Sequence, residues 1–260
     1  MILRRITEHV KAQNWFAVIL DFVIVVVGVF IGIQAANWNA EQNNQRTARD
    51  YAVRIQGELA ANKRDMAGRT EYFNRVKGHA LRALEALDDP PETLGEEFII
   101  DSYFASQTLR RRISRSTYNE LLSANEINTY IDRGLRQRLD EYYRAIESSQ
   151  DVFIAVPPYL EMIRSVMPHV AQTKLRSGDC TIIYGSDEEG TAAAILPDRC
   201  ELDLTPEQTA MVVSRLLAAD LEPGLTRVLA DIEFKLLLIQ SVSTRAQSLL
   251  DYLDYNEATK

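Results

Sequence analysis

The sequence predicts an all-α protein with one N-terminal transmembrane helix, followed by an extracytoplasmic bundle of long helices. Three observations support this fold class. One apolar run near the N-terminus is long enough to span a bilayer. In most of the remaining chain, apolar residues recur every three or four positions. Loop signals and helix-start signals separate these stretches. With 260 residues, the chain is long enough for one or two domains with a substantial core.

The charge balance excludes one class of partner. Lys and Arg total 29 against 37 Asp and Glu, which leaves a formal net charge of -8. A protein that binds nucleic acid needs a basic surface to displace the counterions of the phosphates. We therefore expect no nucleic-acid partner.

The predicted transmembrane helix contains uninterrupted apolar sequence from Phe22 to Ile33. Extended to Trp15 and Trp38, the segment has 24 residues, roughly 35 Å of helix, which is enough to cross a bilayer core. These are the chain's only two tryptophans, and indole rings prefer the headgroup level. We therefore expect a bilayer-spanning helix over 15–38, with Trp15 and Trp38 as interface anchors.

Two other structures are compatible with an apolar run of this kind. A helix buried in a soluble core is one, although such a helix does not need tryptophan at both ends. A cleaved signal peptide is the other. Against cleavage, Asp21 interrupts the hydrophobic region, and no clean A-x-A site follows the run. An uncleaved signal anchor is the interpretation that the residues favour.

Charges on the two sides of the span predict its orientation. Arg4, Arg5 and Lys11 precede Trp15, whereas no Lys or Arg follows the span until Arg46. By the positive-inside rule, the N-terminus lies in the cytoplasm and the bulk of the chain outside it. The predicted parts are a cytoplasmic N-terminus (1–14), a transmembrane helix (15–38) and an extracytoplasmic helical domain (39–260).

One face of the predicted span has the composition of a helix-pairing surface. Asp21, Gly28, Gly32 and Ala35 fall within roughly 60° of one another on a helical wheel. Gly28 and Gly32 form a GxxxG pattern, which allows close approach of two helix backbones. We expect this face to pack against its own copy or against a partner helix. The alternative for Asp21 is that its carboxylate reaches the membrane interface.

The two cysteines, Cys180 and Cys200, predict one disulfide in an exported domain. Closing such a loop would stabilise the fold by about 3 kcal/mol, whereas a cytosolic domain would leave two free thiols. The surrounding segment, 175–204, is rich in glycine and has a β-prone run at 181–184, so we expect a disulfide-stapled loop or a small hairpin. The acidic tip at 187–190 lacks the ligand spacing of a calcium loop and is expected to be solvated.

Apolar spacing between Ile55 and Leu87 predicts a first long helix over about 40–88, continuous with the span. The sequence "DDPPETLG" at 88–95 then has the composition of a loop. A second block begins near Glu96.

In "TYNE", Thr117 is the expected N-cap and Glu120 the N3 residue of a capping box. Helical spacing continues from there to Ile146, and Pro157 ends or kinks that helix. A further helix is expected over 159–174.

The C-terminal part has the clearest helix start. In "TPEQ", Thr205 is the expected N-cap, Pro206 occupies N1 and Gln208 occupies N3. This helix should run to about Ala219. A last, long helix is expected from Pro223, because a sustained three-and-four apolar spacing follows.

No catalytic, cofactor-binding or metal-ligating motif is visible. Of the three histidines, His9 precedes the predicted span, and His79 and His169 lie in helical stretches with no nearby Cys or paired acid. No phosphate-binding glycine loop is present. We therefore expect a protein that is not an enzyme and that needs no cofactor.

Four arginines, Arg110, Arg111, Arg112 and Arg115, precede the expected start at Thr117. Clustered guanidinium groups can bind an anionic headgroup or an acidic partner surface. The alternative is a solvated basic surface that pairs with the domain's own carboxylates.

Two stretches resemble an uncharacterised family of bacterial single-pass membrane proteins. The first is "LDFVIVVVGVFIGIQAANWN", in which an acidic residue precedes an apolar run that closes on a Q-x-x-N-W-N signature. The matching positions are Asp21, Gln34, Asn37, Trp38 and Asn39. The second is the pattern at 116–143, where Ala124 or Asn125 replaces a glycine that the family usually has. The resemblance implies a bacterial inner-membrane protein with a helical exported domain, and it implies no activity.

These observations favour a membrane-anchored binding, sensing or scaffold module that dimerises or joins a membrane complex. The lipid bilayer is its first partner. The alternative is an accessory subunit of an ion-driven inner-membrane complex, in which Asp21 carries protons beside a multi-span partner.

Overall fold

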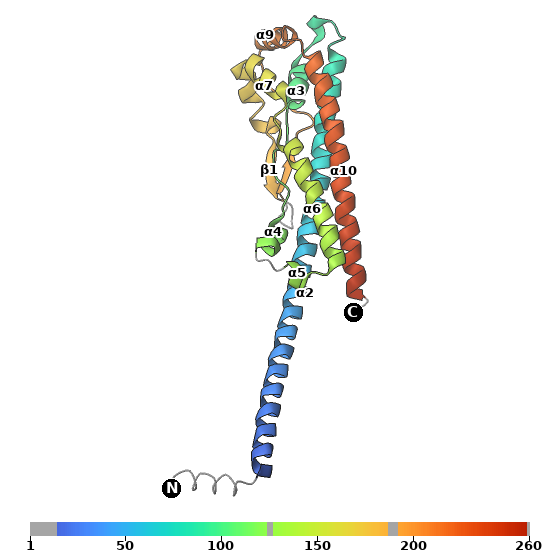
Figure 1. Ribbon diagram of the computed structural model, residues 1–260. Helices are drawn as coiled ribbons and strands as arrows, with labels where there is room; N and C mark the ends of the chain where they lie inside the picture. The colour runs from blue at the N-terminus through green and yellow to red at the C-terminus, as the bar shows by residue number, and fades with distance from the viewer. Residues whose placement is uncertain (1–14, 124–126, 187–191, 259–260) are drawn as a thin grey trace, which may run out of the picture. The chain divides into compact units, whose positions relative to one another are not determined.

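The computed structural model describes residues 15–123, 127–186 and 192–258, and these are mostly helical (Figure 1). The chain divides into two compact units, Met1–Ala52 (unit 1) and Val53–Lys260 (unit 2). The boundary lies inside the longest helix, α2 (Trp15–Ala86). The sequence therefore predicted correctly that the apolar run and the first long amphipathic stretch form one helix.

Unit 1 exposes its apolar side chains. The large apolar residues between Ile19 and Ile33 are 47–68% exposed. In the part of the chain that the structure describes, α2 is the one helix long and apolar enough to cross a membrane. It is therefore a candidate membrane span near the N-terminus.

Unit 2 is built around three long helices that run alongside one another: α2 from Val53 onward, α6 (Arg133–Ile154) and α10 (Glu222–Ala258) (Figure 1). Their apolar faces form the core because the three-and-four spacing places them on one side of each helix. Core residues contributed by the three helices include Ile55, Leu59, Phe73, Leu139, Ile146, Ile239 and Val242.

Shorter elements complete unit 2. They are η1 (Pro91–Thr93), α3 (Glu96–Phe104), α4 (Ser116–Ser123), α5 (Ile127–Tyr130), α7 (Pro158–Val166), α8 (His169–Lys174), η2 (Gly178–Cys180) and α9 (Pro206–Leu217). Helix α9 packs against α3 and α7. The loop predicted at 88–95 returns the chain from α2 to α3.

The expected hairpin and disulfide are both present. Strands β1 (Ile183–Ser186) and β2 (Ala192–Ile195) pair antiparallel, with Ile183 opposite Ile195. Cys180 and Cys200 flank the hairpin and are joined by a disulfide bond. The acidic tip at 187–190 lies outside the described residues.

Two predicted helices are divided. The helix expected from Thr117 to Pro157 is split into α4, α5 and α6. Helix α6 begins afresh because Asp132 is its N-cap, and its Oδ1 accepts from the Gly134 and Leu135 amides at 2.8 and 3.0 Å. The helix expected over 159–174 ends at Val166, since Pro168 has no N–H to continue it. The family's glycine position, Ala124 or Asn125, lies outside the described residues.

The predicted capping box at Thr117 is wrong. Helix α4 begins one residue earlier, at Ser116, and Thr117 is its second residue. The Thr117 amide donates to the buried carboxylate of Glu58 on α2, at 2.8 Å, and the Ser116 hydroxyl donates to the same oxygen at 2.8 Å. A carboxylate distant in sequence has therefore replaced the local cap.

Candidate functional site

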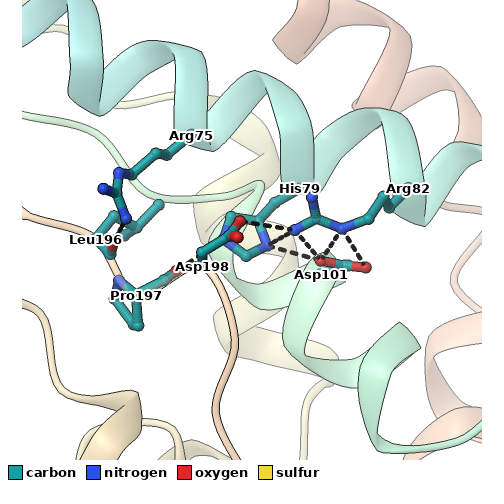
Figure 2. Close-up of polar contacts among 7 residues, drawn as sticks. All are labelled: Arg75, His79, Arg82, Asp101, Leu196, Pro197 and Asp198. Carbon is teal, nitrogen blue, oxygen red and sulfur yellow. Dashed lines mark hydrogen bonds and ion pairs between the residues drawn. The ribbon is translucent and has the colours of Figure 1, made fainter.

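Three side chains on one face of α2 bind the segment that follows β2. Arg75, His79 and Arg82 lie one and two turns apart, so they point in the same direction. Each contacts one of the residues 196–198 (Figure 2). The contacts are Arg75 Nη1 to Leu196 O (3.0 Å), His79 Nε2 to Pro197 O (3.0 Å) and Arg82 Nη2 to Asp198 Oδ1 (3.8 Å).

Residues 196–204, which we call the strap, are fixed at two further points. Cys200 is bonded to Cys180. The Glu96 carboxylate on α3 accepts from the main-chain amides of Leu204 and Leu202, at 2.7 and 3.1 Å. The strap is therefore held by α2, by α3 and by a covalent bond.

His79, Arg82 and Asp101 form a compact group, which we call the His79 cluster; the Arg82 side chain is 45% exposed. His79 is fully buried and Asp101, on α3, is 8% exposed. Asp101 Oδ1 lies 2.7 Å from His79 Nδ1 and 2.9 Å from Arg82 Nη2, and the last two atoms are 2.8 Å apart (Figure 2). Arg82 Nε also donates to both Asp101 oxygens at 3.1 Å. The expectation that His79 has no paired acid is therefore wrong.

An open cavity of about 560 Å³ lies beside this cluster and the disulfide. Its lining contains five carboxylates and two guanidinium groups, so it favours positively charged groups. The lining residues are Arg82, Glu97, Ile100, Asp101, Asp179, Asp198, Arg199, Cys200 and Glu201. Because both Arg82 and Asp101 belong to the His79 cluster, changes in that cluster reach the cavity wall directly.

A second buried polar group surrounds Glu58, and we call it the tyrosine cluster. Glu58 accepts from the Tyr143 hydroxyl as well as from the start of α4. Asn62 donates to the Tyr142 hydroxyl at 3.1 Å. Burial raises the pKa of both tyrosines, and the nearby Glu58 charge adds to the increase. This group joins α2, α4 and α6.

Tyr118 lies next to the tyrosine cluster. Its pKa is raised to about 12, chiefly by burial, and a hydrogen bond to Asp140 contributes. The ring stacks on that of Tyr143, with centroids 4.1 Å apart.

The four clustered arginines contact the protein itself at three positions. Arg111 forms an ion pair with the buried Asp65, Arg115 lies 3.7 Å from Glu147, and Arg110 donates to the Ile154 carbonyl at 3.0 Å. Arg112 is exposed. Two of the four thus pair with the domain's own carboxylates, which is the alternative that the sequence left open.

The predicted helix-pairing residues, Asp21, Gly28, Gly32 and Ala35, are all exposed on α2 in unit 1. No atom lies within 4 Å of a methyl group placed on Gly28 or Gly32. Trp38 is 68% exposed, and the Trp15 side chain lies outside the described residues. Pairing through this face stays a prediction.

Among residues 15–123, 127–186 and 192–258, no group of three or more His, Cys, Asp or Glu side chains is arranged to hold a metal ion. The chain matches no model of a known protein family, no curated protein and no solved structure. Functional inference therefore depends on the geometry and on the sequence patterns described above.

Proposed function

We propose that this protein is a single-pass membrane protein whose helical unit 2 is an extracytoplasmic binding or sensing module. The observation that supports the anchor is the exposed apolar surface between Ile19 and Ile33. An apolar surface of this extent is unfavourable in water and favourable in a bilayer, where a helix satisfies its own backbone hydrogen bonds. The disulfide in unit 2 supports an oxidising compartment for that unit.

The candidate ligand site is the open cavity between Arg82, the strap and the disulfide. It is concave, its wall is positioned by α2 and α3, and its fixed charges could orient a small charged ligand. The resemblance of the anchor to a bacterial family supports a bacterial inner membrane as the location. The proposal therefore includes a ligand site at this cavity and a location in the bacterial inner membrane.

The topology is tested on the full chain expressed in bacterial cells. We expect it to stay in the membrane pellet after alkaline extraction, and a protease added to spheroplasts should digest residues 39–260. The control is a Val25→Asp and Val26→Asp double variant, which should be lost from the pellet. Extraction of the wild-type chain, or protection of unit 2 in spheroplasts but not in lysed cells, would contradict the proposal.

A second function is favoured by one residue, because Asp21 is an ionisable group inside the apolar run of α2. Intramembrane carboxylates are costly and often serve ion pathways or helix contacts. In this case the chain would be an accessory subunit of an ion-driven complex. If Asp21 has no such role, we expect the span to form a homodimer through Gly28, Gly32 and Ala35.

Purification from native membranes in mild detergent distinguishes these two possibilities. A stoichiometric multi-span partner that is lost in Asp21→Asn would favour the accessory subunit. A homodimer that is unchanged in Asp21→Asn and dissociated by Gly32→Leu would favour the helix-pairing face. A monomer that ignores both substitutions would contradict both.

A further inference from the structure

We propose that His79 is a proton-sensitive switch that determines whether Arg82 is held inside the His79 cluster or released toward Asp198 in the cavity wall. The inference concerns regulation of the candidate ligand site, so its role in ligand control rests on the proposed function. The switch itself depends only on the geometry of four side chains.

The cluster contains a triangle of three polar atoms that cannot all be satisfied together. Arg82 Nη2, His79 Nδ1 and Asp101 Oδ1 are separated by 2.7, 2.8 and 2.9 Å. The guanidinium nitrogen is always a donor and the carboxylate oxygen an acceptor. Nδ1 is an acceptor in one protonation state and a donor in the other, so each state satisfies two edges and opposes the third.

In the neutral state, a proton on Nε2 satisfies two contacts, because Nε2–H donates to the Pro197 carbonyl and Nδ1 accepts from Arg82; a proton on Nδ1 would satisfy only the contact with Asp101. Nδ1 is then an acceptor for Arg82 Nη2, and its lone pair faces the Asp101 oxygen. In the protonated state, Nδ1–H donates to Asp101, and two donors now oppose each other at Arg82 Nη2. The Pro197 contact survives in both states, so the strap stays in place while the Arg82 contact changes.

The released guanidinium has a defined destination. Asp198 Oδ1 lies 3.8 Å from Arg82 Nη2 and lines the cavity. Arg82 Nε remains on Asp101, at 3.1 Å from both oxygens, which anchors the side chain during the change. The charged groups around His79 are therefore Arg82 on α2, Asp101 on α3 and Asp198 on the strap, with Arg75 one turn earlier. Protonation adds one positive charge to this wall of an otherwise acidic cavity.

The test is nitrogen NMR of the full chain in detergent micelles, labelled with ¹⁵N-histidine, between pH 5 and pH 8. The chain has only three histidines, so His9→Gln and His169→Gln variants assign the His79 signals. Histidine ordinarily changes charge in this pH range. We expect a neutral form with the proton on Nε2 at pH 8, and a form protonated on both nitrogens at acidic pH. A single protonation state throughout, or a neutral form with the proton on Nδ1, would overturn the switch.

Two variants test the exchange of partners, with folding verified by circular dichroism. Asp101→Asn removes the negative charge that favours the protonated state and should move the His79 transition to lower pH by about one unit. Arg82→Leu removes the group that opposes protonation and should move it to higher pH. Asp198→Asn removes the negative charge toward which Arg82 is released, so it should also move the transition to lower pH, but by less than Asp101→Asn. Shifts of the same sign in Asp101→Asn and Arg82→Leu would overturn the proposal.

Because these spectra need no ligand, they separate the switch from the proposed function. If the spectra are as expected but the chain fails the membrane test, the switch would be supported and the membrane anchor contradicted.

Discussion

The two polar clusters that involve α2 each contain a buried carboxylate, but the hydrogen-bond donors around the two carboxylates differ. In the tyrosine cluster, Glu58 accepts from a phenol, a hydroxyl and a main-chain amide, all of them neutral donors. In the His79 cluster, Asp101 faces an imidazole and a guanidinium. Both carboxylates are about equally buried, at 8% exposed.

The difference shows that the donors, rather than the burial, decide what such a carboxylate can do. Neutral donors with high pKa values keep their protons across the physiological range, so the tyrosine cluster is a fixed brace between α2, α4 and α6. Histidine is the side chain that ordinarily changes charge within that range, and the switch that we propose for the His79 cluster depends on this property. One helix thus holds both a brace and a candidate sensor.

The largest effect that this comparison predicts is at Glu58. Glu58→Leu leaves the Tyr143 hydroxyl, the Ser116 hydroxyl and the Thr117 amide without their acceptor. Two of these groups, the Tyr143 hydroxyl and the Thr117 amide, belong to buried residues. Each unsatisfied buried group costs about 1–3 kcal/mol, so we expect a loss of about 4 kcal/mol in the free energy of unfolding, measured by urea denaturation.

Glu71→Leu is the matched control, because Glu71 is exposed on the same helix and pairs only with Arg75. It should change the free energy of unfolding by less than about 0.5 kcal/mol. Equal losses in the two variants would show that Glu58 does not brace the fold.

The disulfide should have the next largest effect, and a local one. Replacing Cys180 and Cys200 by alanine should lower the free energy of unfolding by about 3 kcal/mol, because the unfolded chain regains the entropy of the open loop. By hydrogen exchange, residues 196–204 should lose protection while Tyr142 and Tyr143 keep theirs. Uniform loss of protection would indicate that the strap is not a separate element held on the His79 cluster.

Two helix starts with similar sequences show how far local patterns predict this fold. Thr205 forms the predicted capping box: the Gln208 amide donates to its hydroxyl at 3.3 Å, and its own amide donates to the Gln208 side chain at 3.0 Å. Thr117 has the same signature with Glu120, but Glu58 reaches its amide instead. The capping-box sequence thus predicts where a helix has amides that need an acceptor, but the tertiary structure determines which acceptor those amides bind.

The His79 cluster was missed although part of its signal was present. The loop at 88–95 was predicted correctly, and a tight return there places residues of α2 beside residues of α3. His79 and Asp101 stand on opposite sides of that loop, so an acid partner could have been expected. The contact with Pro197 had no such signal, since only the folded strap brings it to α2.

A third prediction concerns the hydroxyl of Tyr143. Tyr143→Phe removes one donor to Glu58 and should lower the free energy of unfolding by about 1.5 kcal/mol at pH 7. Folding raises the pKa of this tyrosine, so the unfolded chain loses its proton first, above a pH of about 10. Stability is therefore unaffected below that pH and falls as the pH rises beyond it.

Spectrophotometric titration checks the same point. The buried Tyr142 and Tyr143 should stay protonated at a pH at which exposed tyrosines have ionised. The variant should lose stability less steeply than the wild type in alkaline solution. Ionisation of all tyrosines together, with the fold intact, would contradict the buried network.

The smallest effect tests a buried charge that forms no ion pair with a carboxylate among the residues that the structure describes. Lys235 on α10 is 5% exposed, and its Nζ lies 5.0 Å from the Phe73 ring centroid and 3.4 Å from Thr108 Oγ1. Burial is the largest cause that lowers its pKa, and Asp231 opposes the decrease only in part. At neutral pH the folded protein therefore holds a charge at a cost, and Lys235→Met should raise the free energy of unfolding by roughly 1 kcal/mol.

The pH dependence separates this cost from a simple gain in packing. Because the folded pKa is below the unfolded one, the unfolded chain binds the extra proton between the two values, and wild-type stability recovers as the pH rises through that window. The gain in the free energy of unfolding of Lys235→Met over wild type should therefore be largest at pH 7 and smaller at pH 10. The buried tyrosines also affect stability near pH 10, but they do so equally in both proteins and cancel in the difference. Lys77→Met removes a partly exposed lysine paired with Glu233 and should show no such trend. A gain in Lys235→Met that does not change with pH would mean that Phe73 and Thr108 already stabilise the charge.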